Sequence, residues 1–265
     1  IMKDRPIIVV VALLTLVALV LVVGCAKKVA PPQTGEQPVA MDDDKRVLEH
    51  TVGRGETLAL IADNYYGDPG RRTDIARDNG LADPDRIVPG SVLRLRFTED
   101  EWEGARRRAQ ALGPYNKGVE LMGQDRLGEA EKQFRTALEA APDLAAARYN
   151  LALVLLKRGH TEQALTLLEE LTAARPDDKD FRFAHGNALF QSARFDEAAE
   201  QFEAALGRDP GFKRAAFGLA RSLQEAGHTD RAIAAWQAYL ELDDSSSWAG
   251  AARRNLAELQ DPGES

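Results

Sequence analysis

Hydrophobic and polar positions divide the chain into four stretches with different periods. An uncharged, largely apolar run occupies residues 7–23, and a polar stretch with three prolines and no aromatic residue follows at 26–44. Residues 49–97 mix short alternating segments with short helical ones, whereas from residue 98 onward apolar side chains recur at helical spacing. The pattern therefore predicts a leader, a tether that cannot bury a core, a small α+β module and a long helical region.

The module at 49–97 is predicted to have the order strand, helix, helix, strand. A short strand at 50–52 precedes a helix that starts at Leu58, where Thr57 is placed to cap it. A second helix at about 73–79 ends at Gly80, a residue suited to a helix C-terminus. In the last segment, 91–97, the side chains alternate between two faces, and the apolar face carries Leu93, Leu95 and Phe97.

The module contains a set of short motifs in a fixed order: His50-Thr51-Val52, Gly55-Glu56-Thr57-Leu58, Ile61-Ala62, Tyr65-Tyr66-Gly67-Asp68-Pro69, Ile75-Ala76, Asn79-Gly80-Leu81 and Ile87-Val88-Pro89-Gly90. With these motifs the module resembles the LysM domain. LysM domains bind glycans that contain N-acetylglucosamine, such as peptidoglycan, in a shallow groove between two loops. The resemblance implies a groove lined by Gly55, Glu56, Thr57, Leu58, Ile87, Val88 and Pro89. Arg71-Arg72 departs from the family pattern and puts the packing of the second helix in doubt.

The helical region repeats every 34 residues. The series in register are Pro142, Pro176 and Pro210; Ala130, Ala164, Ala198 and Ala232; Phe134, Leu168, Phe202 and Trp236; and Gly118, Ala152, Gly186 and Ala220. This period, with small residues where paired helices cross, resembles the tetratricopeptide repeat (TPR), whose helix hairpins stack into a superhelix. We predict four copies starting near residues 111, 145, 179 and 213, preceded by a connecting helix that Gly113-Pro114 interrupts.

A second series of aromatic residues marks a predicted groove for a protein or peptide partner. Aromatic rings beside amide groups suit an extended peptide or a partner's helix. The alternative is that the rings pack between neighbouring first helices, because aromatic stripes are usually core. Arg214 and Arg221 alone are too few to predict a basic clamp for an acidic C-terminus. The predicted groove residues are Tyr115, Asn116, Tyr149, Asn150, Phe183, Asn187, Phe217 and Arg221.

Cys25 is the single cysteine of the chain and directly follows the apolar run. Val22-Val23-Gly24-Cys25 resembles a bacterial lipobox, which implies cleavage after Gly24 and acylation of the cysteine. Acylation at more than one position anchors a protein stably to a membrane. Ala26 after the cysteine favours the outer membrane over the inner one by the Gram-negative sorting rule. An uncleaved transmembrane anchor is the alternative.

The predicted fold class is an α+β LysM module (βααβ) followed by an all-α TPR superhelix. The predicted organisation is a lipoprotein signal peptide at 1–24, a lipid-anchored disordered tether at 25–48, LysM at 49–97, a connecting helix at 98–113, four TPR copies within 114–244 and a capping helix and tail at 247–265.

Charge and motifs exclude several function classes. The formal net charge of −8 argues against nucleic acid as a partner, because phosphates require a basic surface. No phosphate-binding glycine loop or nucleophile elbow is present, so we predict no enzymatic activity and no cofactor. The four histidines are predicted to be turn or surface residues without a metal: His50, His160, His185 and His228.

These features together predict a non-catalytic envelope lipoprotein. It would bind peptidoglycan through the LysM module, face the periplasm from a lipid anchor, and hold protein partners through the TPR groove. Two alternatives stay open. One is an assembly factor of an envelope machine, in which the LysM fold is a spacer with weak or lost glycan affinity. The other is a protein that recruits a cell-wall hydrolase.

Overall fold

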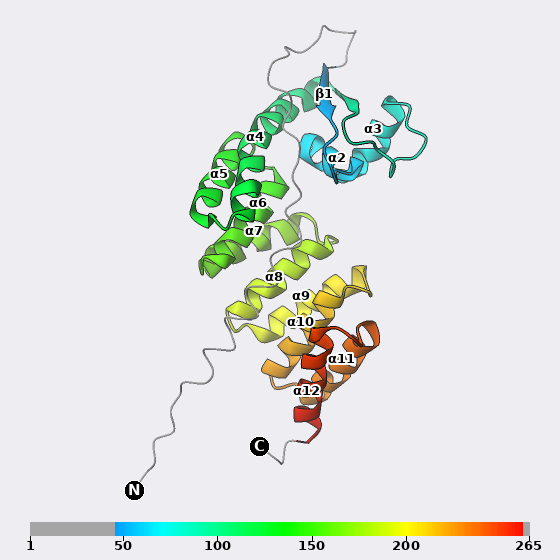
Figure 1. Ribbon diagram of the computed structural model, residues 1–265. Helices are drawn as coiled ribbons and strands as arrows, with labels where there is room; N and C mark the ends of the chain where they lie inside the picture. The colour runs from blue at the N-terminus through cyan, green and yellow to red at the C-terminus, as the bar shows by residue number, and fades with distance from the viewer. Residues whose placement is uncertain (1–45, 262–265) are drawn as a thin grey trace. The chain divides into compact units, whose positions relative to one another are not determined.

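A computed structural model describes residues 46–261 of the chain (Figure 1). The chain divides into two compact units between Arg158 and Gly159. The predicted signal peptide, Cys25 and residues 25–45 of the predicted tether lie outside the described residues, whereas residues 46–48, also predicted as tether, form the start of β1. In the N-terminal unit the elements are β1 (Arg46–Thr51), α2 (Leu58–Tyr66), the 3-10 helix η1 (Pro69–Arg71), α3 (Arg72–Asp78), β2 (Val92–Phe97), α4 (Glu99–Gly123), α5 (Leu127–Ala140) and α6 (Ala145–Lys157). The C-terminal unit contains α7 (Thr161–Ala174), α8 (Lys179–Gln191), α9 (Phe195–Arg208), α10 (Lys213–Glu225), α11 (Thr229–Leu242) and α12 (Ser247–Gln260).

The first fold element is a two-stranded antiparallel sheet with α2 and α3 between its strands in sequence. β1 and β2 pair in a register that sets Arg46 opposite Phe97 and Thr51 opposite Val92. The predicted alternation on β2 is confirmed, since Leu93, Leu95 and Phe97 are buried. Thr57 caps α2 as predicted, with its hydroxyl accepting a hydrogen bond from the Leu60 amide.

The helix α4 contradicts the predicted interruption at Gly113-Pro114. It runs without a break over 25 residues and contains Pro114 in its interior. Proline lacks the amide hydrogen that would bond the preceding turn, so other interactions must hold the helix together. A capping box between Thr98 and Glu101 fixes its start, and buried residues on both sides of the proline, Leu112 and Tyr115, fix its middle. The connecting helix and the first helix of the first repeat are therefore one element.

The 34-residue period corresponds to pairs of successive helices from α4 to α11. Small residues occur where an aromatic ring lies against a helix backbone. A Cβ atom added to Gly186 of α8 would lie 2.8 Å from the Phe202 ring of α9, and one added to Gly218 of α10 would lie 2.7 Å from the same ring. The Phe202 ring is thus held between two glycines, and the contact requires the absence of a side chain at both.

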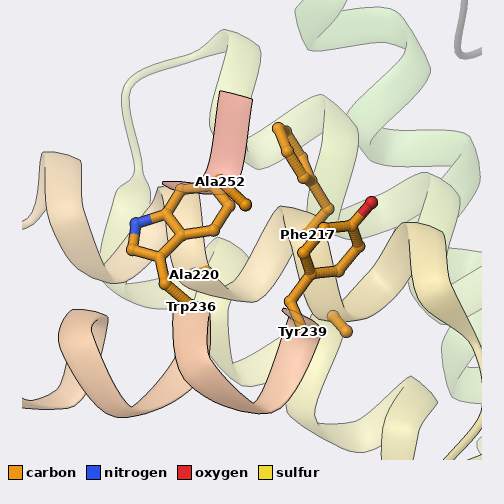
Figure 2. Packing of buried hydrophobic residues seen from close by; sticks show 6 residues of the cluster. Phe217, Ala220, Trp236, Tyr239 and Ala252 are labelled. Carbon is orange, nitrogen blue, oxygen red and sulfur yellow. The ribbon is translucent and has the colours of Figure 1, made fainter. Parts of the chain in front are cut away.

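A terminal helix covers the last pair, as predicted. Ser246 caps α12 through its hydroxyl, which accepts hydrogen bonds from the amides of Trp248 and Ala249. The cluster beneath α12 joins Phe217 and Ala220 of α10 to Trp236 and Tyr239 of α11 and Ala252 of α12 (Figure 2). This apolar cluster closes the C-terminal end of the array, since α12 supplies the contacts that a further repeat would make.

Candidate functional site

A buried side chain, Glu56, holds the loop between β1 and α2 through hydrogen bonds. Gly55 adopts φ 78°, a left-handed conformation that favours glycine. The Glu56 side chain turns inward, where its carboxylate accepts hydrogen bonds from the Gly53 amide at 2.6 Å and from His50 Nε2 at 2.8 Å. As a carboxylate Glu56 can only accept, so His50 Nε2 carries the proton. The carboxylate therefore fixes the shape of the loop.

The structure corrects three sequence-based placements in this region. The side chains of Glu56 and Leu58 are buried, so they do not line an open groove as predicted. His50 was predicted to lie at a turn or on the surface, but its ring is buried against Tyr65, with the Nδ1 atom 3.2 Å from the tyrosine hydroxyl. Burial also raises the pKa of Tyr65 above its ordinary value. His185 in α8 is likewise buried, which lowers its pKa.

Backbone hydrogen bonds join the β1–α2 loop to the loop before β2. The Gly90 amide donates to the Val52 carbonyl at 2.7 Å, and the Val52 amide donates to the Ser91 carbonyl at 2.8 Å. Ser91 then closes the second loop, because its hydroxyl donates to the Val88 carbonyl at 2.7 Å. The structure thus brings together the two predicted sides of the groove. Gly55 and Thr57 are exposed on one side, and Val88 and Pro89 are exposed on the other, with Ile87 half-buried.

Two exposed apolar side chains lie at these loops. Val88 is 69% exposed and Val92 is 55% exposed, and they are the large hydrophobic residues that stand out as exposed over residues 46–261. Val92 begins β2, one residue after Ser91, and its side chain points to the solvent face. The sequence prediction missed Val92 as a site residue. The available signal was an apolar residue on the otherwise charged face of a strand that also carries Arg94 and Arg96.

Side chains of the LysM-like module and of α4 hold the two together. Arg71, which was expected to weaken packing, instead lies over the Tyr66 ring at 4.6 Å and pairs with Asp74 and Glu101. Arg108 of α4 donates to the Tyr65 carbonyl at the end of α2. Because the last carbonyls of a helix are partly negative, this cation stabilises the α2 terminus. The loops and α4 consequently belong to one compact unit.

Three of the four predicted groove aromatics are core residues. Tyr115 is 2% exposed, Phe183 is 4% exposed and Phe217 is 7% exposed (Figure 2 shows Phe217). The Tyr115 hydroxyl accepts a hydrogen bond from the buried Asn150 amide at 3.1 Å, and burial raises the Tyr115 pKa. Asn116 is also buried. These side chains pack inside the fold, which agrees with the alternative that the rings are core residues. The prediction that they line a groove was wrong.

The other predicted groove residues are partly exposed. Tyr149 lies on α6, Asn187 on α8 and Arg221 on α10. The Arg221 guanidinium lies 4.7 Å from the centre of the Phe190 ring of α8. Burial lowers the pKa of Arg221, and its nearest carboxylate is Glu225 at 3.9 Å.

Comparison with protein families decides the classification. Residues 50–96 match the LysM domain, and three overlapping matches to the tetratricopeptide repeat cover residues 115–179, 149–211 and 183–247. The chain belongs to the tetratricopeptide repeat family. It carries a LysM domain ahead of the repeats, and the predicted fold class of a LysM module followed by TPR helices is confirmed.

Individual relatives match this TPR protein over part of its length. It is 31% identical over 135 residues to DnaJ homolog subfamily C member 3 of Mus musculus, which covers 47% of the chain and 27% of that relative. Among solved structures, MamA MSR-1 C2 has a TM-score of 0.52 at 21% identity, over 58% of the chain and 86% of that structure. YrrB, a TPR protein with an unusual peptide-binding site, has a TM-score of 0.51 at 20% identity, over 75% of the chain and 98% of that structure. At these identities the solved structures share the fold alone.

LysM and TPR domains are non-catalytic binding domains. Over residues 46–261, acidic, histidine and cysteine side chains form no group that could hold a metal ion. No helix in the same range is long and apolar enough to cross a membrane. In general, a LysM domain suggests glycan binding and TPR repeats suggest protein or peptide partners.

Proposed function

We propose that this protein holds peptidoglycan through its LysM loops and a protein partner through its TPR helices, while a lipid on Cys25 anchors it to a membrane of the cell envelope. The observation that carries the glycan half is the pair Val88 and Val92, which expose apolar surface beside two loops rich in backbone polar groups. An N-acetyl group offers a methyl for apolar contact and an amide for hydrogen bonds to the backbone. The pair of loops matches both needs.

A pelleting assay with purified peptidoglycan sacculi tests the glycan half. We expect Val88→Ser and Val92→Ser each to weaken co-sedimentation of the full chain by several-fold, because each removes exposed apolar contact without removing core. Val47→Ser is the matched control. Val47 lies on β1 opposite Arg96, at the far end of the sheet from the Thr51–Val92 pair, about 13 Å from the loops. Equal loss in all three variants would contradict a site at the loops.

The anchor proposal rests on the apolar run at 7–23 and the Val22-Val23-Gly24-Cys25 motif. Outer-membrane attachment facing the periplasm follows from Ala26 by the sorting rule. Labelling cells with an alkyne fatty acid tests it, since the wild-type chain should incorporate the label and Cys25→Ser should not. Incorporation by Cys25→Ser would contradict acylation at this residue, and a wild-type chain that associates with the membrane without incorporating label would favour an uncleaved anchor.

The partner half can be tested at the partly exposed Tyr149 of α6. A photo-crosslinking amino acid at this position should capture a specific protein in cells, and the capture should persist when residues 49–97 are deleted. The same amino acid at Arg254, an exposed residue of α12, is the control. Identical captured proteins from both positions would indicate random collision and not a binding face.

A further inference from the structure

Charge is segregated between the two sets of helices in the C-terminal unit. The first helices of the repeats, α8 and α10, carry five basic residues and two acidic ones. The second helices, α7, α9 and α11, carry nine acidic residues and two basic ones. The basic set is Lys179, Arg182, Lys213, Arg214 and Arg221. Of these five helices, α8 and α10 are therefore net positive, whereas α7, α9 and α11 are together net negative.

Two of these arginines lie over phenylalanine rings. Arg214 lies 4.9 Å from the centre of the Phe183 ring and 5.2 Å from that of Phe212. Seven residues further along α10, Arg221 lies 4.7 Å from the Phe190 ring. Since seven residues are close to two helical turns, both arginines are on the same face of α10. We call this pair of stacks, Arg214 on Phe183 and Arg221 on Phe190, the arginine ladder.

The ladder leaves hydrogen-bond donors unused. Over residues 46–261, Arg214 donates no hydrogen bond and forms no ion pair, and Arg221 approaches only Glu225, at 3.9 Å. By contrast, Lys179 is 2.5 Å from Asp209 and Arg182 donates to Gln201 at 2.7 Å. Stacking on a ring uses the flat face of a guanidinium and leaves the N–H groups at its edge free. Contact with the rings therefore explains where each arginine lies. It does not explain why the N–H groups at the edge of each guanidinium have so few partners.

The N–H edges of two guanidinium groups are suited to bind a pair of carboxylates. A guanidinium can hold a carboxylate through two parallel hydrogen bonds, which a lysine cannot do. The two ladder arginines are about 10 Å apart along α10, at 1.5 Å per residue. A partner helix with acidic residues seven positions apart presents two carboxylates on one face at the same spacing. An extended strand does not, because its side chains alternate between opposite faces.

We propose that the arginine ladder binds an acidic helix of a partner protein, with carboxylates at positions i and i+7 held by Arg214 and Arg221. This inference rests on the proposed function, because it names the chemistry of the partner that the TPR helices hold. Asn187, which lies between Phe183 and Phe190 on α8 and is partly exposed, is placed to contact the backbone or a polar side chain of that helix.

Fluorescence anisotropy with a labelled, alanine-rich helical peptide tests the ladder in the full chain. The probe carries glutamates at i and i+7, and two control peptides carry glutamines at those positions or glutamates at i and i+5, which face different sides of the helix. We expect Arg214→Gln and Arg221→Gln each to weaken binding of the probe by about tenfold, the loss of one charge-assisted pair. Arg254→Gln, the same change at an exposed residue of α12, should leave binding within about twofold.

Each outcome decides the inference. Tight binding of the i, i+7 probe alone, lost with either ladder arginine and kept with Arg254→Gln, supports it. Equal binding of the glutamine or i+5 peptides, or equal loss with Arg254→Gln, overturns it in favour of non-specific charge attraction. Sacculus pelleting and crosslinking from Tyr149 are measured on the same variants. If those persist while the probe fails to bind, the ladder inference falls and the proposed function stands. Unchanged near-ultraviolet circular dichroism of each variant excludes a folding defect.

Discussion

Removing the Glu56 carboxylate should destabilise the loop between β1 and α2, because the carboxylate accepts the hydrogen bonds that hold this loop. Its oxygen accepts from the Gly53 amide at 2.6 Å and from His50 Nε2 at 2.8 Å, and its side chain is fully buried. Glu56→Ala leaves the buried His50 donor and the partly buried Gly53 amide without this acceptor. A buried donor without a partner costs about 1–3 kcal/mol and a partly exposed one costs less, so we expect a loss of about 2–4 kcal/mol in local stability. Glu56→Gln keeps one oxygen at the same place and should lose clearly less.

Hydrogen exchange read by mass spectrometry is the suitable assay, because it reports the free energy of local opening in the full chain. Peptides that span residues 50–61 should exchange faster in Glu56→Ala, and peptides from α9 should be unchanged. Sacculus binding should fall in parallel with loop opening and recover in Glu56→Gln. Our reasoning would be refuted if Glu56→Ala abolished sacculus binding without faster exchange. That result would make the carboxylate a direct contact to glycan.

Three further predictions concern the helices and are read from urea unfolding of the full chain. Pro114→Ala should stabilise the N-terminal unit by about 1–3 kcal/mol, since it restores an amide donor inside α4, and a loss of stability would contradict this. Gly186→Ala should destabilise by about 1–2 kcal/mol, because its Cβ would lie 2.8 Å from the Phe202 ring, whereas Gly207→Ala, with nothing within 4 Å, should be neutral or stabilising. Hydrogen bonds from Ser246 and Tyr239 lower the pKa of Asp243 to about 2. A depressed pKa stabilises the fold above the unfolded value of about 3.9 and loses that effect as pH falls toward 2. Asp243→Asn should therefore cost stability at pH 6 and little at pH 2, and an equal cost at both would count against the assignment.

Much of the fold follows from local rules that the sequence states directly. The 34-residue period specifies the helix pairs, because each copy repeats the same small and bulky positions where two helices cross. Alternation over Val92 to Phe97 specifies the buried face of β2, and Thr57 and Thr98 specify two helix starts, since capping depends on a few neighbouring residues. These features need no knowledge of distant contacts.

Tertiary contacts decided what local rules could not. Pro114 ends a helix by local preference, yet α4 continues because buried residues on both sides hold it. A phenylalanine at the same repeat position could line a groove or fill the core, and burial of Phe183 and Phe217 shows that packing chose the core. The Arg221 guanidinium lies over Phe190 although 31 positions separate them. Sequence therefore determined the identity and order of the domains, whereas the residues left open to ligands were decided by long-range packing, which depends on three-dimensional neighbours and not on spacing along the chain.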